Sequence, residues 1–125
     1  MKLRVLIVDD ERGIRDLLSE VISSEGHHVI CADSGIEALE RLSSSSIDIV
    51  FLDVRMPRGD GMTALKEIHS LWPNLPVIMI TGGGNREIMI KARELGAVAC
   101  MLKPFSMVDV IDMLDEYGQG IRIAA

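Results

Sequence analysis

The chain of 125 residues is 48% hydrophobic and 26% charged, the balance of a single globular domain that can bury one continuous core. No apolar run reaches the roughly 20 residues that cross a bilayer, so the sequence excludes a membrane protein. The formal net charge of −6, without a Lys/Arg-rich patch, argues against direct binding of nucleic acid, because a phosphate backbone repels an acidic surface. No signal-type segment with a small-residue cleavage site follows Met1, so we expect a cytoplasmic location.

Apolar segments of two kinds alternate along the chain. Short, almost uniformly apolar runs predict buried strands, and longer runs with apolar residues at helical spacing predict helices. In chain order they are strand 3–8, helix 10–25, strand 28–32, helix 34–46, strand 47–52, helix 62–71, strand 76–80, helix 86–95, strand 97–102 and helix 106–114.

The ends of several helices have recognisable signals. Gly26 and Gly96 follow the first and fourth helices, as expected of residues that end a helix, and Pro73 ends the third. Ser34 and Glu37 have the spacing of a capping box at the start of the second helix.

Strands that alternate with helices and are apolar throughout predict a parallel sheet covered by helices on both faces. The fold class is therefore α/β, doubly wound. We expect one domain over residues 1–117, followed by a short C-terminal tail or the start of a linker over residues 118–125. Cys31 and Cys100 lie in strand-like segments without the close pairing of metal or redox motifs, so we expect buried thiols.

Polar residues stand at the ends of four predicted strands. The pair Asp9-Asp10 follows the first strand, Asp53 the third, Thr81 the fourth and Lys103 the fifth. Because the binding crevice of such sheets lies at the carboxyl ends of the strands, these side chains should converge on one cleft.

Neighbouring carboxylates repel one another, so a cluster of three predicts a bound cation. Mg²⁺ prefers hard oxygen ligands and uses one or two carboxylates together with phosphoryl oxygens. We expect Asp10 and Asp53 to be direct ligands, Asp9 to act through water, and the backbone carbonyl of Arg55 to complete the protein's share.

A carboxylate can also act as a nucleophile that forms an aspartyl phosphate. Phosphoryl transfer requires positive groups and hydrogen-bond donors around the phosphoryl oxygens. We expect Asp53 to be the phosphoacceptor, with Lys103 pairing with one phosphoryl oxygen and the Thr81 hydroxyl donating to another.

The acidic pair Asp9-Asp10, the segment 53–57 (Asp-Val-Arg-Met-Pro), Thr81 and the segment 103–105 (Lys-Pro-Phe) together resemble the receiver domain of bacterial two-component response regulators. The resemblance covers nearly the whole chain and implies a flavodoxin-like sheet of strand order 2-1-3-4-5 with five helices.

The resemblance also implies a function and partners. A receiver takes a phosphoryl group from a phosphohistidine on a sensor histidine kinase or phosphotransfer protein, or from a small phosphodonor. It catalyses only its own phosphotransfer and autodephosphorylation and is otherwise not an enzyme. An output domain or partner protein would be contacted through the fourth helix, fifth strand and fifth helix, and the chain would be a monomer or weak homodimer.

In this family an aromatic residue three positions before the lysine turns inward when the threonine moves toward the phosphoryl group. That position is Cys100 here, and a thiol has no ring to rotate. The sequence therefore predicts a weaker switch, or one carried by backbone movement around Thr81 and Gly82.

Two other functions compete with the switch. A small phosphatase of the haloacid dehalogenase type also uses an aspartate nucleophile with threonine and lysine, but its nucleophile normally ends the first strand as Asp-x-Asp beside a cap domain. This chain has Asp9-Asp10-Glu11 and no room for a cap. A receiver-like binding module that signals without phosphorylation is the second alternative, which Cys100 and the glycines 82–84 favour.

Two further features have less specific interpretations. Asp10 could simply cap the first helix. Ile88, Met89 and Ile90 cannot all face the core from one helix, so they indicate either an apolar docking surface or ordinary packing with one exposed isoleucine.

Overall fold

The computed structural model describes residues 2–56, 61–83 and 86–118. Five parallel strands form one sheet in the order β2-β1-β3-β4-β5, which confirms the predicted α/β class and strand order. In chain order the strands are β1 (Arg4–Val8), β2 (His28–Ala32), β3 (Ile49–Asp53), β4 (Val77–Thr81) and β5 (Ala99–Leu102).

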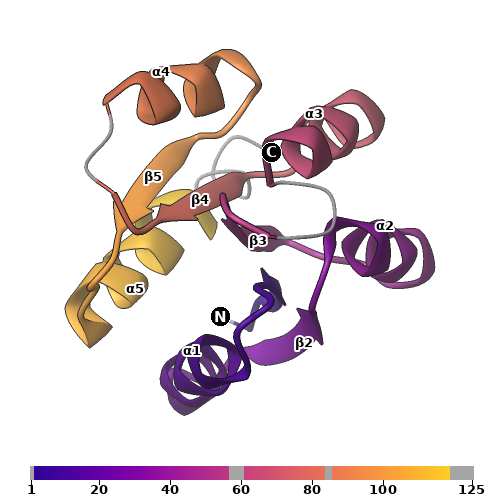
Figure 1. The fold of residues 1–125 in the computed structure, drawn as a ribbon. Coiled ribbons are helices and arrows are strands. Elements are labelled where there is room, and N and C mark those ends of the chain that lie inside the picture. Colours follow the sequence, from indigo (N-terminus) through magenta and orange to yellow (C-terminus); the bar gives the residue numbers. More distant parts are fainter. Residues whose placement is uncertain (1, 57–60, 84–85, 119–125) are drawn as a thin grey trace.

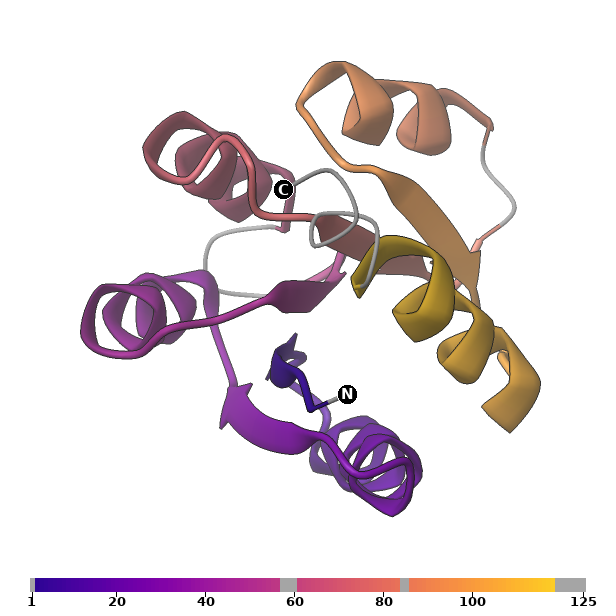
Figure 2. The ribbon, with the colours of Figure 1, turned by 180° about the vertical axis from the view of Figure 1, so that it is seen from behind.

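Helices cover both faces of this sheet (Figures 1 and 2). They are α1 (Arg12–Ser24), α2 (Gly35–Ser44), α3 (Gly61–Leu71), α4 (Arg86–Glu94) and α5 (Met107–Met113), which the π-helical turn η1 (Leu114–Gly118) continues. No helix among the described residues is both long and apolar enough to cross a bilayer.

Two hydrophobic clusters lie on opposite faces of the sheet. Residues of α2, α3 and α4 pack on one face, where Leu52 is fully buried, and residues of α1 and α5 pack on the other, where Phe51 is fully buried. Successive residues of a strand point to opposite faces, so a strand buried on both sides must be apolar at every position. This requirement explains the uninterrupted apolar runs of the sequence.

Four strands start later than the sequence predicts, β1 and β4 by one residue and β3 and β5 by two. β3 begins at Ile49 rather than residue 47, and just before it Asp48 forms two hydrogen bonds with Arg4. The Arg4 N–H donates to the Asp48 carboxylate and the Asp48 N–H donates to the Arg4 carbonyl, each at 2.8 Å. β5 begins at Ala99 rather than residue 97, because the N–H of Ala97 still donates to the carbonyl of Ala92 at the end of α4.

The predicted helix ends are mostly confirmed. Gly26 and Gly96 follow α1 and α4 with φ of 89° and 112°, the left-handed region that favours glycine. The Ser34 hydroxyl accepts from the Glu37 N–H at 3.2 Å, but the Glu37 carboxylate accepts from the N–H of Asp33 instead of closing the predicted box on Ser34.

Two remaining helix starts differ from expectation. At α1 the capping position is Glu11, without a side-chain cap hydrogen bond, so Asp10 is not the cap. At α5, Ser106 and Asp109 form a complete capping box that the sequence analysis did not identify.

The prediction of two buried thiols was wrong, because Cys31 and Cys100 are only partly buried. Both lie on the edge strands β2 and β5, where the helices cover side chains less completely than at the centre of the sheet.

Candidate functional site

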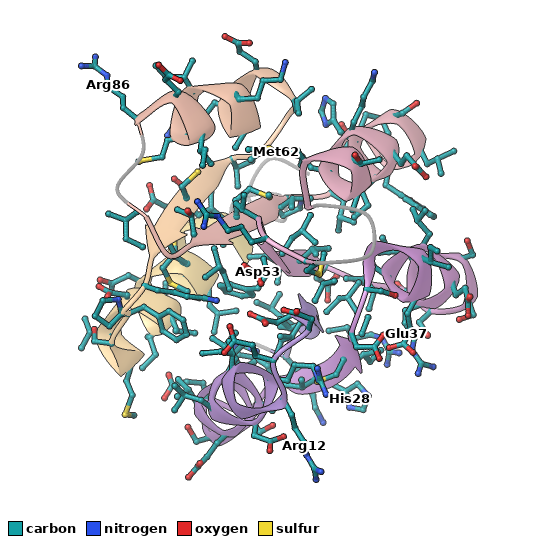
Figure 3. All side chains as sticks on the ribbon, in the orientation of Figure 1. Arg12, His28, Glu37, Asp53, Met62 and Arg86 are labelled. Carbon is teal, nitrogen blue, oxygen red and sulfur yellow. The ribbon has the colours of Figure 1, made fainter. Side chains whose placement is uncertain are left out.

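Three carboxylates meet at the carboxyl ends of β1 and β3. Asp9 and Asp53 are 0% and 3% exposed, whereas Asp10 is exposed to solvent. One carboxylate oxygen from each lies within 4.8 Å of the others. Figure 3 shows Asp53 in the middle of the molecule, while the side chains of Arg12 and Arg86 point away from it.

Lys103, which follows β5, brings a positive charge to this cluster. Its Nζ lies 3.6 Å from Oδ2 of Asp9 and 3.7 Å from Oδ1 of Asp53. It also lies 3.8 Å from Oε1 of Glu11, a mostly exposed carboxylate that the sequence analysis did not include. One ammonium therefore faces several carboxylates and cannot neutralise them all.

The electrostatics of the site favour a proton on the buried acids. Burial, and then the charge of Asp9, raise the pKa of Asp53 to about 6. Burial also raises the pKa of Asp9, although the N–H of Glu11 and the charge of Lys103 oppose this shift. Both pKa values rise because a charged carboxylate is less stable when it is buried away from water.

These residues fit a divalent cation. Oδ2 of Asp9 is buried and accepts no hydrogen bond within the described part of the chain, and the Lys103 ammonium is its charged neighbour at 3.6 Å. Three carboxylates provide the hard oxygen atoms that Mg²⁺ prefers. A cation there would neutralise the same repulsion that raises the pKa of Asp53.

The structure brings Thr81 to the same edge, but its hydroxyl forms no hydrogen bond with the carboxylates. Asp53 pairs with Ile80 across β3 and β4, so Thr81 lies one residue beyond it. The buried Thr81 hydroxyl instead forms hydrogen bonds with the backbone N–H and carbonyl of Gly83, at 3.4 and 3.3 Å.

Arg55 contacts the acceptor position through its backbone. Its N–H donates to Oδ1 of Asp53 at 3.3 Å, and its side chain is exposed. The role of its carbonyl as a metal ligand remains a prediction, and Pro57 of the same motif lies outside the described residues.

Two supporting contacts were missed by the sequence analysis. Nη1 of Arg15, on α1, donates to the backbone carbonyl of Asp9 at 2.8 Å. At the start of α3, a Cβ at Gly61 would collide with the backbone carbonyl of Asp53. Pro57, Gly59 and Gly61 indicate a turn in the sequence, but they do not predict that Gly61 lies against the backbone of Asp53.

A cavity of about 570 Å³ opens beside the carboxylates. Asp10 and Arg55 line its polar side, and Met56, Met62 and Ile88 line its apolar side. Ile88 of the predicted α4 patch thus faces this opening, while Ile90 is 48% exposed, so whether α4 forms a docking surface remains a prediction.

The sequence model of the response regulator receiver domain matches residues 5–115. Sporulation initiation phosphotransferase F of Bacillus subtilis (strain 168) is 36% identical over 117 residues, which is 94% of each chain. The transcriptional regulatory protein PdtaR of Mycobacterium tuberculosis is 39% identical over 113 residues, which is 90% of this chain and 55% of PdtaR.

Solved structures show the same fold. NtrX from Brucella abortus, solved in complex with ADP, superposes with a TM-score of 0.94 at 35% identity over 99% of this chain and 29% of NtrX. A CheY-like response regulator receiver domain protein from Methanospirillum hungatei JF-1 superposes with a TM-score of 0.94 at 26% identity over all of both chains.

The fold and the acidic site at its carboxyl edge define a signalling receiver module. The chain belongs to the response regulator receiver domain family, as the resemblance predicted. It is a phosphorylation-dependent signalling switch of two-component systems and a regulatory domain rather than a classical enzyme. The chain spans nearly all of the Bacillus relative but about half of PdtaR.

Proposed function

We propose that Asp53 accepts the phosphoryl group and that Asp9, Asp10, Asp53 and the backbone carbonyl of Arg55 hold Mg²⁺. The observation that carries this proposal is the position of Lys103. Its ammonium lies 3.6 Å from Asp9 and 3.7 Å from Asp53, so the nucleophile, the acidic cluster and the cationic side chain form one group.

Asp53 is the nucleophile in the phosphoryl transfer. A carboxylate oxygen attacks the phosphorus of the donor and forms a P–O bond, while the P–N bond to the donor histidine breaks and the leaving imidazole takes up a proton. Bound Mg²⁺ would supply neutralisation of the negative charge on the phosphoryl oxygens. Autodephosphorylation is hydrolysis of this bond. Water attacks the phosphorus, the P–O bond to Asp53 breaks, and phosphate and the Asp53 carboxylate are released.

Lys103 and Thr81 serve different steps of this reaction. Lys103 already contacts Oδ1 of Asp53, so it can pair with a phosphoryl oxygen as soon as that group arrives. The Thr81 hydroxyl has to leave its hydrogen bonds with Gly83 before it can donate to another phosphoryl oxygen. This exchange would couple phosphorylation to the β4–α4 loop.

The partners follow from the same role. The donor is a sensor histidine kinase or a phosphotransfer protein in the cytoplasm. The output surface is the face formed by α4, β5 and α5, where the apolar side chains of Leu102, Met107 and Val108 are 44%, 58% and 63% exposed. The chain acts as a monomer or a weak homodimer.

The decisive experiment is incubation with a small acyl phosphate and Mg²⁺, followed by intact mass measurement. The wild-type chain and the control Asp16→Asn, a surface substitution on α1, should each gain one phosphoryl group. Asp53→Asn should gain none, and Lys103→Met should be labelled far more slowly because it lacks the ammonium.

Other outcomes point to the competing functions. Labelling of Asp53→Asn would contradict the assignment of the acceptor. No labelling of the wild-type chain would favour the receiver-like module that works without phosphorylation, and multiple turnover of a free phosphomonoester would favour the phosphatase.

A further inference from the structure

We propose that residues 119–125, called here the tail, fold back and dock in a groove at the amino-terminal edge of the sheet, opposite the carboxylate cluster. This surface is independent of the phosphoacceptor site. Figure 2, which views the molecule from behind, shows the connections that follow α2 and α3 entering β3 and β4 at this end.

The groove, called here the basal groove, has a volume of about 500 Å³. Its apolar lining comes from the end of α2, the end of α3 and the two connections into the sheet. The residues are Leu42, Ile47, Leu71, Trp72 and Leu75. Trp72 is only half-buried and Leu71 is 63% exposed, so apolar surface remains to be covered there.

Gly118 connects the basal groove to the tail. It is the last residue of η1 and itself lines the groove. Gly118 is buried against the side chain of Leu3, close enough that a Cβ would collide with it. The chain is therefore held at this edge of the sheet at the point where residues 119–125 begin.

The sequence of the tail suits this groove. Residues 119–125 are Gln-Gly-Ile-Arg-Ile-Ala-Ala, and an extended chain of seven residues reaches at most roughly 25 Å. In such a chain Ile121 and Ile123 point to the same side, because side chains alternate. Two branched apolar side chains can thus enter the groove together.

Charge also favours this occupant over an acidic segment. Arg122 carries the only side-chain charge of residues 119–125, and Asp48 carries the only side-chain charge among the described residues that line the groove. The two charges are opposite, so the approach of the tail is electrostatically favourable. Burial of the two isoleucines is expected to dominate, because it removes more apolar surface from water.

The chain provides its own reporter for this contact. Trp72 is the only tryptophan and lines the basal groove, so its emission, excited selectively over that of Tyr117, measures the environment of the groove. The comparison is between the full chain, a chain that ends at Gly118, the double variant Ile121→Ser/Ile123→Ser and the control Ala124→Ser/Ala125→Ser.

If the tail docks, truncation and the Ile→Ser pair shift Trp72 emission to longer wavelength and increase its quenching by acrylamide. The control pair leaves both unchanged. A synthetic peptide of residues 118–125, added to the truncated chain, restores the original emission in a saturable manner, and the same peptide with both Ile→Ser changes does not. Unchanged far-UV circular dichroism shows that the variants remain folded.

Two results would overturn the proposal. One is identical emission and quenching in the full and truncated chains. The other is emission that depends on protein concentration together with a dimer in sedimentation, because the occupant of the groove would then be a second copy of the chain.

Discussion

Asp53 shows how the fold controls the protonation of a single side chain. Its pKa of about 6 lies above the ordinary value of 3.8, because it is buried and faces the charge of Asp9. The folded chain thus binds this proton more tightly than the unfolded chain does. As a result, the charged form of Asp53 destabilises the metal-free protein at neutral pH.

Stability without metal should therefore fall as pH rises from about 4 to about 6. One pKa unit corresponds to about 1.4 kcal/mol, so Asp53 lowers the free energy of unfolding by up to about 3 kcal/mol across this range. Urea unfolding at several pH values in the presence of a chelator measures the effect. Asp53→Asn should flatten the profile, although Asp9 contributes a slope of the same sign, and superimposable profiles would contradict the prediction.

Cys100 stands at the position where the resemblance to receivers predicts an aromatic ring. It is half-buried, packs against the hydrophobic cluster on the α4 face, and pairs with Met79 in register. Its thiol cannot make the inward rotation of an aromatic ring, so its response to phosphorylation should be small.

Cys100→Tyr should enlarge the response of the α4–β5–α5 face. The measurement is the change in backbone amide chemical shifts on that face after addition of acyl phosphate and Mg²⁺. Cys100→Ala, which also lacks a ring, should behave like the wild type. An unchanged response in Cys100→Tyr would show that the side chain at this position does not limit the switch.

At the scale of elements, the turn between α4 and β5 depends on one glycine. Gly96 has a φ of 112°, and a Cβ there would collide with the imidazole ring of His69 on α3. Gly13, within α1, has no atom within 4 Å of the same position. A side chain can therefore be added at Gly13 in α1 but not at Gly96, which follows α4.

Gly96→Ala should destabilise the fold by about 2 kcal/mol, because it adds both backbone strain and a steric clash. Gly13→Ala should stabilise it by about 0.5 to 1 kcal/mol through helix propensity. Thermal or urea unfolding gives both values. Addition of His69→Ala to Gly96→Ala should recover only the steric part, and full recovery would show that the backbone carries no strain.

The helices and strands also show which features can be predicted from the sequence. The order of helices and strands and the stops at Gly26 and Gly96 could be predicted, because each depends on neighbouring residues. The hydrogen bonds of Asp48 with Arg4 just before β3 could not be predicted, because β1 lies beside β3 in the sheet but far from it in the sequence. The half-burial of Cys31 depends in the same way on β2 being an edge strand.

At the scale of the whole molecule, parallel topology alone explains why the site could be predicted. All strands point the same way, so the residues that follow them must share one edge, and Asp9, Asp53 and Lys103 do so. The contact of Arg15 with the Asp9 carbonyl and that of Gly61 with Asp53 depend on helix placement. Sequence spacing does not encode those contacts.

A ligand that binds only the assembled site should stabilise the entire fold. At a free Mg²⁺ concentration of 100 times Kd, the free energy of unfolding should rise by about 2.7 kcal/mol. Thermal unfolding with and without Mg²⁺ measures this gain. Asp10→Asn, which alters the exposed carboxylate of the proposed metal site, should reduce the gain, whereas Asp16→Asn should not. Equal gains in both variants would place the metal elsewhere.

The distance along the chain between Asp9 and Lys103 also has a consequence for biosynthesis. The ribosome delivers the acidic side chains of β1 and β3 well before it delivers the lysine that follows β5. A nascent chain that docked β3 beside β1 would gather like charges without their ammonium counterpart. Assembly of that edge before β5 is made is thereby disfavoured, and the residue that follows β5 supplies the positive charge that lets the edge close.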